Sequence, residues 1–297
     1  MDQKYPDLAK PVWFFLEMDK FEEIFTKYYP NIRETVTNEM LMTDLITEEN
    51  EAEILKDYAE GFKWYASETA REIHEFGVDI DDPMALRYMW GSPEINERVV
   101  ELIEEQYPVN EGDIICYGPS NITWWYSLEQ DMLPYHAQNH GMGGCIDDDM
   151  INYAPRILYP YKPTAVIFQT GSNDIASGIP LETILNNKRK MYAEFLKNMP
   201  QAKLIVCSGL PLPGRPQYWD ATVETNALLK EMCEQTDRLY FLDATDDMLT
   251  DHGPERFRTS DGRYFNPEYY RVDKIHLNKK GHDVWTRLMK EKLAEIL

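Results

Sequence analysis

A serine follows a short apolar run in the segment 113–128, DIICYGPSNITWWYSL. The run ends at Gly118, and Pro119 and Ser120 precede a stretch with a helical pattern that begins near Asn121. This order predicts a strand, a tight turn and a helix, with Ser120 at the turn. The carboxyl end of a strand and the amino end of a helix both favour chemistry at such a point. Ser120 is therefore a candidate nucleophile, although a serine in this position is more often a helix cap.

Three further segments carry residue types that could work with a serine. They are Asn139–Cys145 (NHGMGGC), Gly171–Asp174 (GSND) and Asp273–Asn278 (DKIHLN). Ester hydrolysis by a serine needs a general base, an acid that orients the base, and N–H donors aimed at the developing oxyanion. His276 offers the base, and Asp273, three residues earlier, offers the orienting carboxylate.

Donors for an oxyanion are present in the two glycine-containing segments. Gly144, preceded by a second glycine, offers a backbone N–H that a substrate can approach closely, because glycine has no side chain. Asn173 offers a side-chain amide, and the N–H of Ser120 is a third donor. Each signal is weak alone, since glycines mark turns and Asn-Asp pairs cap helices. Their order along the chain, after successive strand candidates, favours a shared site.

The elements that must position these residues follow one pattern after residue 112. Short apolar runs alternate with helical patterns, which predicts a parallel sheet covered on both faces. The predicted strands are Asp113–Tyr117, Tyr135–Asn139, Ala165–Gln169, Leu204–Cys207 and Leu239–Leu242. The predicted helices cover 122–132, 147–158, 181–198, 220–236 and 279–296. We interpret the polar stretch 250–272 as a loop that borders the site.

Residues 1–110 differ from the rest and predict a helical N-terminal extension. Apolar residues recur at spacings of three and four, and a helix is predicted to start after Ser92-Pro93 and to stop near Pro108. This part holds 26 acidic and 10 basic residues, against 26 and 20 in the remainder. We therefore divide the chain into an extension, 1–110, and a catalytic domain, 111–297. The extension has three candidate roles: a lid, a docking surface or a contact in a homo-oligomer.

Composition and net charge argue against several classes of binding partner. The net charge of −22 argues against nucleic acid and against anionic membrane surfaces. The start lacks the basic and apolar regions of a signal peptide, and no stretch has about 18 uncharged apolar residues, as a membrane span would need. The four cysteines form no CxxC pair, and we expect reduced thiols and a cytoplasmic location.

At these residues the sequence resembles the SGNH hydrolases, also called GDSL esterases and lipases. The four segments match the signature blocks of that family in order, and the likeness continues in Leu277-Asn278-x-x-Gly281-x-x-x-Trp285. It covers residues 111–297. The resemblance implies a flavodoxin-like three-layer α/β/α domain with a five-stranded parallel sheet. It also implies hydrolysis of carboxylic esters without a cofactor or metal.

The family's roles carry over residue by residue. Ser120 falls on the nucleophile, Asp273 and His276 on the acid and base, and Gly144 and Asn173 on the oxyanion-hole donors. Two departures are Pro119, where the family usually has Asp, and Cys145, where a small polar residue or Asp often follows the glycine.

Other residues near the blocks have open roles. Trp125 and Arg215 are candidate substrate-binding residues, and a structural ion pair is the alternative for Arg215. His136 and His140 are four apart, a spacing that on a helix suggests a metal pair. Because they border a strand end, we favour for both either loop positions or positions directly behind the site residues. We expect His282, in the last helix, to be exposed.

Three functions remain open. The leading one is an esterase for short acyl groups, such as acetyl, on a carbohydrate or a small metabolite. The second is a lysophospholipase or thioesterase, which would need an apolar channel. The third is a non-catalytic binding protein with a decayed site, against which the retention of all five site residues argues.

Overall fold

The computed structural model describes residues 93–297, except 124, 126 and 271–273. Most of the predicted N-terminal extension therefore lies outside the described residues, and its proposed boundary and roles stay predictions. The described chain begins with the helix α6, Pro93–Gln106, which starts after Ser92-Pro93 and stops before Pro108 as predicted. Arg156 links this helix to α9 (Asp147–Ile157) through ion pairs to Glu97 and Glu104.

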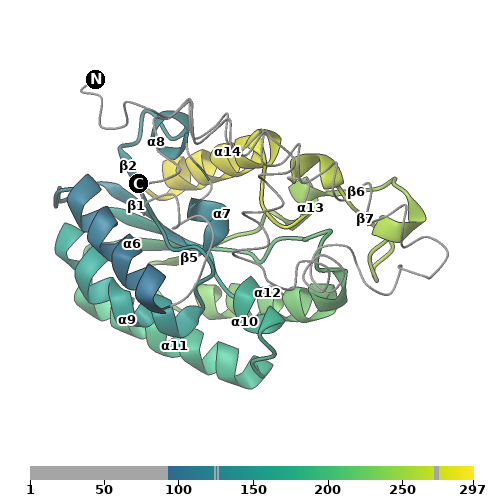
Figure 1. Cartoon of the computed structure of the whole chain (residues 1–297), viewed down its shortest axis with the longest axis horizontal. Coiled ribbons are helices and arrows are strands. Elements are labelled where there is room, and N and C mark those ends of the chain that lie inside the picture. Colours follow the sequence, from purple (N-terminus) through teal and green to yellow (C-terminus); the bar gives the residue numbers. More distant parts are fainter. Residues whose placement is uncertain (1–92, 124, 126, 271–273) are drawn as a thin grey trace, which may run out of the picture.

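A five-stranded parallel sheet forms the centre of the molecule and confirms the predicted fold class (Figure 1). The strand order is β2-β1-β3-β4-β5, the order of flavodoxin-like folds. The strands are β1 Ile114–Gly118, β2 Ala137–Gly141, β3 Ala165–Phe168, β4 Lys203–Cys207 and β5 Leu239–Leu242. Four of them lie within one residue of the predicted bounds, while β2 starts and ends two residues later than predicted.

Strand β2 differs from its predicted bounds because its central residues are polar but buried. Its sequence is AQNHG, and all five residues are buried. Each long polar side chain has a hydrogen-bond partner that makes burial acceptable. Asn139 Nδ2 donates to the carbonyl oxygens of Ile122 and Trp125, and Gln138 Nε2 donates to Asp113 Oδ2.

Side chains of the strands alternate between two cores, as the pleat of a sheet requires. Ile115, Val166 and Val206 face one core, and Cys116, Ile167 and Ile205 face the other. Helices α6, α9, α11 (Leu181–Asn198) and α12 (Trp219–Glu234) contribute to the first core. Helices α8 (Leu128–Asp131) and α14 (Lys279–Ile296) contribute to the second. Figure 1 shows these two helical layers on opposite faces of the sheet.

Two predicted segments differ in the structure. The single helix expected over 122–132 is instead two short helices, α7 (Ser120–Thr123) and α8, because the chain turns between them and buries Trp125. The expected loop 250–272 contains a two-stranded antiparallel hairpin, β6 (Leu249–Thr250) and β7 (Tyr264–Phe265), with short 3-10 turns around it. Phe257, Phe265 and Leu249 pack with Trp219 in a small core of their own, which explains why this polar stretch is folded.

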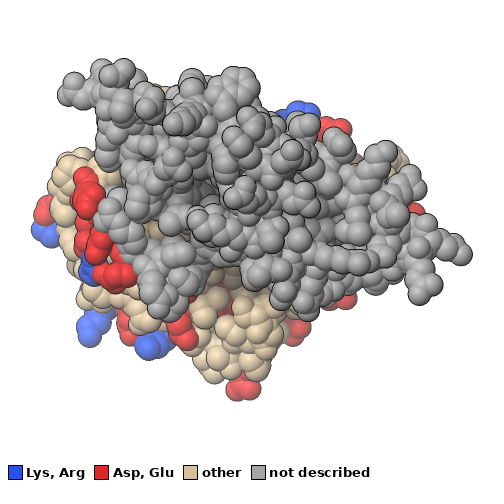
Figure 2. All heavy atoms as spheres, viewed as in Figure 1, with Lys and Arg blue, Asp and Glu red and all other residues tan. Residues whose placement is uncertain are grey.

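Acidic side chains are frequent on the surface near α6, where Glu97, Glu104 and Glu105 are exposed (Figure 2). Within the described part of the chain, no helix is both long enough and apolar enough to cross a bilayer.

Candidate active site

Ser120 is the first residue of α7 and follows directly on the end of β1. The turn is tight, since Pro119 O accepts hydrogen bonds from Ile122 N at 2.9 Å and from Thr123 N at 3.2 Å. Gly118 is required here because a Cβ at this position would lie 2.5 Å from the carbonyl oxygen of Gln169. Pro119, which has no N–H to donate, thus serves the turn through its carbonyl.

Gly144 lies in the loop after β2, and Asn173 lies in α10 (Ser172–Ala176) after β3. Gly144 has a φ of 75°, a left-handed conformation that glycine adopts without strain. Asn173 Nδ2 donates to Cys145 O at 3.1 Å, so the second and third sequence segments are in direct contact. Because β2 and β3 are the two neighbours of β1, the segments that hold Ser120, Gly144 and Asn173 all leave the same edge of the sheet.

His276 is half-buried and belongs to a segment attached to the serine turn. Leu277 N, the next backbone amide, donates to Asn121 Oδ1 at 2.9 Å. Five residues later, His282 Nε2 lies 3.2 Å from Asn121 O. The residue after the candidate nucleophile is therefore bonded to the segment of the candidate base. Asp273 lies outside the described residues, and its role as the orienting acid stays a prediction.

Arg215 contacts Asn173 in this structure. Its Nη1 lies 3.1 Å from Asn173 Oδ1 and 3.2 Å from Ser172 Oγ, and it also approaches Ser172 O at 3.4 Å. The guanidinium group is thus engaged with the loop that carries a predicted oxyanion donor. The sequence predicted either a substrate contact or a structural ion pair for this residue. The contacts with Ser172 and Asn173 test neither role, and both stay predictions.

Trp125 is packed inside the protein, and its role as a substrate-binding residue stays a prediction. The side chain is fully buried, and its ring stacks on His282 with centroids 5.1 Å apart and planes 5° apart. Its Nε1 donates to Asp131 Oδ2 at 2.8 Å. The expectation that His282 is exposed is wrong, because its ring is buried between Trp125 and the serine turn.

The two other histidines occupy different places. His140 lies in β2 and not in a loop. Its side chain can be buried there because both of its ring nitrogens have partners in the core. They face Ile157 O and, at 2.9 Å, Gln138 Oε1. Because His140 lies in β2 and His136 lies before it, the two do not share the helix that a metal pair at this spacing needs. His136 precedes β2, and its carbonyl oxygen accepts from Ile114 N.

A buried ion pair beneath the site was missed in the sequence. Lys188 Nζ lies 3.0 Å from Asp147 Oδ1, and both side chains are wholly inaccessible to solvent. Thr170 Oγ1 donates to the same Asp147 oxygen at 2.8 Å, and Asp147 N donates to Asp174 Oδ1 at 3.1 Å. The loops after β2 and β3 are therefore joined to α11. The detectable signal was Lys188 at helical spacing from Ile184, on the apolar face of that helix.

The cluster of Asp147, Asp174 and Lys188 holds more acidic than basic groups. It contains two carboxyl groups and one ammonium, and one oxygen of each carboxyl, Asp147 Oδ2 and Asp174 Oδ2, is buried without a hydrogen-bond partner. Burial, and next the charge of Asp147, raise the pKa of Asp174 to about 6, although the Lys188 ammonium opposes this rise. A protonated Asp174 would relieve the excess of negative charge next to Asn173.

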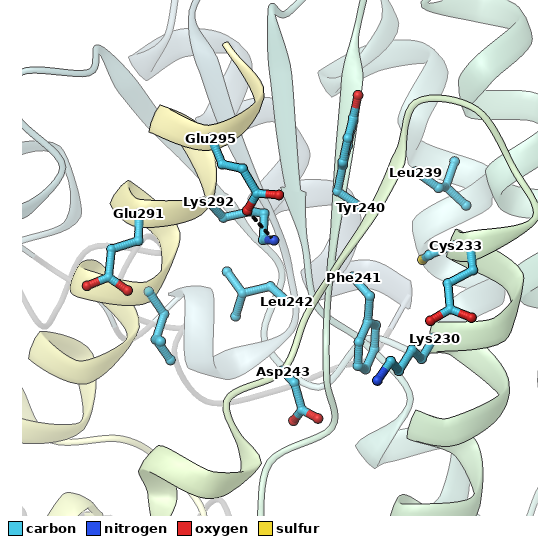
Figure 3. A pocket seen from close by; sticks show the side chains of 12 residues that line it. Lys230, Cys233, Leu239, Tyr240, Phe241, Leu242, Asp243, Glu291, Lys292 and Glu295 are labelled. Atoms are coloured by element: carbon cyan, nitrogen blue, oxygen red, sulfur yellow. Dashed lines mark hydrogen bonds and ion pairs between the residues drawn. The ribbon is translucent and has the colours of Figure 1, made fainter.

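Two cavities of different size lie in the described part. A cavity of about 550 Å³ lies between β5, α12 and α14, where Lys292 pairs with Glu295 at 2.6 Å (Figure 3). No predicted site residue lines it. A small cavity of about 10 Å³, large enough for one water, borders Ser172 and Arg215 and is closed by Leu210, Leu212, Tyr218, Trp219 and Thr222.

Comparison with known proteins assigns a family. The family model described as the GDSL-like Lipase/Acylhydrolase family matches residues 111–284, more than half of the chain. No curated protein matches the sequence.

Solved structures share the fold at low sequence identity. A candidate platelet activating factor from Streptococcus pneumonia is 16% identical, with a TM-score of 0.53, over 83% of this chain and 100% of the other. A candidate acylhydrolase from Bacteroides fragilis is 20% identical, with a TM-score of 0.54, over 69% and 99%. A GDSL-like lipase from Bacteroides thetaiotaomicron is 18% identical, with a TM-score of 0.54, over 68% and 98%. At these identities the likeness concerns the fold alone.

Proposed function

The chain belongs to the GDSL-like Lipase/Acylhydrolase family and is a carboxylic ester hydrolase, and from this premise we propose a serine esterase that acts at Ser120. We assign the nucleophile to Ser120, the general base to His276 and the orienting acid to Asp273. The oxyanion donors are the amides of Ser120 and Gly144 and the side chain of Asn173. The preferred substrates are esters of short acyl groups, such as acetyl, on a carbohydrate or a small metabolite.

One observation carries the assignment of the base. Leu277 N donates to Asn121 Oδ1 at 2.9 Å, which joins the residue after His276 to the residue after Ser120. These residues are 156 positions apart in the sequence. Asn121 is next to Ser120, and Leu277 is next to His276. The hydrogen bond between them therefore keeps the serine and the histidine in adjacent segments, as a proton transfer between their side chains requires.

The mechanism follows from these roles. His276 takes the proton of the Ser120 hydroxyl as the oxygen attacks the ester carbonyl. The three N–H donors stabilise the oxyanion, and one missing donor of this kind costs about 3 kcal/mol in the barrier. His276 then gives the proton to the departing alcohol, which leaves an acyl-serine. Water then attacks the acyl-serine while His276 takes its proton, and His276 returns that proton to Ser120 Oγ as the acid leaves.

Neither of the two cavities described above is lined by Ser120, Gly144 or Asn173. The size of the acyl group is therefore proposed from the sequence and not from a pocket. Aromatic side chains that could stack on a sugar ring give this proposal little support, because Trp125 and Trp219 are buried. Trp124 and Tyr126 lie outside the described residues.

The test compares Ser120→Ala with the parent protein on chromogenic esters of increasing acyl length. We expect turnover of the acetate ester to be lost in the variant and an organophosphonate probe to label the parent protein at Ser120. Near-parental turnover by Ser120→Ala would refute the assignment. A parent enzyme that prefers long acyl chains would instead favour the lipolytic alternative, and a parent protein that turns over no ester and resists the probe would favour a binding protein.

A further inference from the structure

Arg215 belongs to a loop that is bonded to the segment of the proposed acid and base. The loop follows β4, and Gly214 N donates to Lys274 O at 2.9 Å. Lys274 lies between Asp273 and His276 and has a left-handed φ of 59°. Arg215 N donates to Leu212 O at 3.0 Å, which closes a backbone turn that ends at Arg215. The loop therefore reaches the base segment with one residue and Asn173 with the next.

The amide group of Asn173 is held from both of its ends. Its oxygen faces the Arg215 guanidinium, and its nitrogen donates to Cys145 O. In the opposite orientation an N–H would meet the N–H of a guanidinium and an oxygen would meet a carbonyl oxygen. Only one orientation therefore satisfies both neighbours. In that orientation the second hydrogen of Nδ2 is not used by Cys145 O.

We propose that Arg215 is a positioning residue of the oxyanion hole, acting through Asn173. This inference rests on the proposed function. Arg215 fixes the orientation of the amide, so that the remaining N–H of Asn173 is available to the substrate oxygen. A hydrogen bond from a charged donor is stronger than a neutral one, and donation to an amide oxygen polarises the amide and strengthens its N–H as a donor.

A direct contact between Arg215 and substrate is the competing role. The two roles differ in the kinetic parameter that they control. Loss of a group that binds substrate and transition state equally raises KM, whereas loss of a group that acts on the oxyanion lowers kcat. The contacts with Ser172 and Asn173 favour the second role, because they occupy Nη1 of the guanidinium on the protein itself.

Arg215→Gln tests this difference. We expect kcat for an acetate ester to fall about 10- to 100-fold with KM changed less than about threefold, since a whole oxyanion donor is worth about 100- to 1,000-fold. Arg215→Lys should recover part of kcat, because the ammonium still donates to the amide oxygen. Arg189→Gln is the matched control, since this exposed arginine bonds to Asn186 on the surface of α11. An increase in KM with unchanged kcat would contradict the proposal.

A double-mutant cycle shows whether Arg215 acts through Asn173. In an Asn173→Ala background, Arg215→Gln should cost less than about twofold, because the group that it positions is absent. If the double variant loses kcat by the product of the two single-variant factors, the proposal is overturned. Should Arg215→Gln fail to fold, as judged from its thermal transition, the same cycle is run with Arg215→Lys.

Ser120→Ala separates this proposal from the proposed function. Full turnover by Ser120→Ala would overturn the nucleophile and the role of Arg215 together. Loss of turnover in Ser120→Ala with parental kcat in Arg215→Gln would overturn the role of Arg215 alone. The rate of phosphonate labelling of Ser120 is an independent readout, since the phosphonyl oxygen needs the same donors, and it should fall in Arg215→Gln as kcat does.

Discussion

Asn121 Oδ1 accepts the backbone N–H of Leu277 at 2.9 Å in the buried interior of the molecule. Asn121 is 6% exposed, and its backbone carbonyl oxygen faces His282 Nε2. One asparagine thus joins the start of α7 to the segment before α14. This contact gives the proposed serine and histidine a fixed relation that does not depend on their own hydrogen bond.

Asn121→Ala should therefore impair both stability and turnover. The substitution removes the Asn121 oxygen that accepts the buried N–H of Leu277, and the loss of a buried hydrogen-bond partner costs about 1–3 kcal/mol. We expect a lower thermal transition and a reduced kcat for an acetate ester. Asn198→Ala is the control, because this asparagine is exposed at the end of α11, where it donates to Glu194 O. Parental values of both quantities in Asn121→Ala would show that the contact does not hold the two segments.

Gly141 is the last residue of β2, and α7 packs directly against it. An added Cβ would lie 2.3 Å from Thr123 N and 2.6 Å from Thr123 Cα. Gly141→Ala should thus push α7 away and displace Ser120, with a loss of about 1–3 kcal/mol of stability.

The control for Gly141→Ala is Gly262→Ala. Gly262 has a φ of 89°, and its added Cβ would meet no atom within 4 Å. This variant carries backbone strain without a clash near the site. We expect kcat to fall in Gly141→Ala and to stay parental in Gly262→Ala, as measured with an acetate ester below either thermal transition. Equal kcat in both variants would refute a displacement of the serine.

Much of the sheet was predictable because four of its strands are apolar runs bounded by turns. Strand β2 shows the limit of this signal, since Gln138, Asn139 and His140 are buried only because partners elsewhere in the chain satisfy them. The split of the expected helix 122–132 has a similar origin. Trp125 is drawn into the core by its stack on His282, which is far away in the sequence.

The site segments were predictable because each follows a strand, whereas the contacts between them were not. The bond from Arg215 to Asn173 depends on the path of the loop after β4, which leaves no periodicity in the sequence. The ion pair of Lys188 with Asp147 left one clue, a lysine on an apolar helix face. The partner of that lysine lies 41 positions away and could not be chosen from the chain's many acidic residues.

Lys188→Met should strongly destabilise the protein. It leaves the Asp147 carboxylate buried without its ammonium partner, and breaking a buried pair in this way costs about 3–5 kcal/mol. The double variant Lys188→Met/Asp147→Asn should recover part of this loss, because the uncompensated charge is removed. Urea unfolding measures both, with Lys190→Met on the exposed face of α11 as control. A parental midpoint for Lys188→Met would mean that the pair contributes nothing to stability.

Asp174→Asn should change how stability depends on pH. The pKa of Asp174 is raised in the folded protein to about 6, by burial first and by the Asp147 charge next. The folded state therefore holds the proton more tightly than the unfolded state does. The stability that this provides is complete below the pKa of the unfolded carboxyl, about 4, and is lost as pH rises through about 6.

An asparagine cannot ionise, and its oxygen can still accept from Asp147 N. We therefore expect that the urea midpoint of Asp174→Asn, relative to the parent, increases between pH 4 and pH 7. Asp148→Asn, at an exposed position on α9, should leave the pH profile of the parent unchanged. A relative midpoint for Asp174→Asn that stays flat or falls over this range would show that Asp174 is ionised throughout and that its negative charge is compensated in the folded protein.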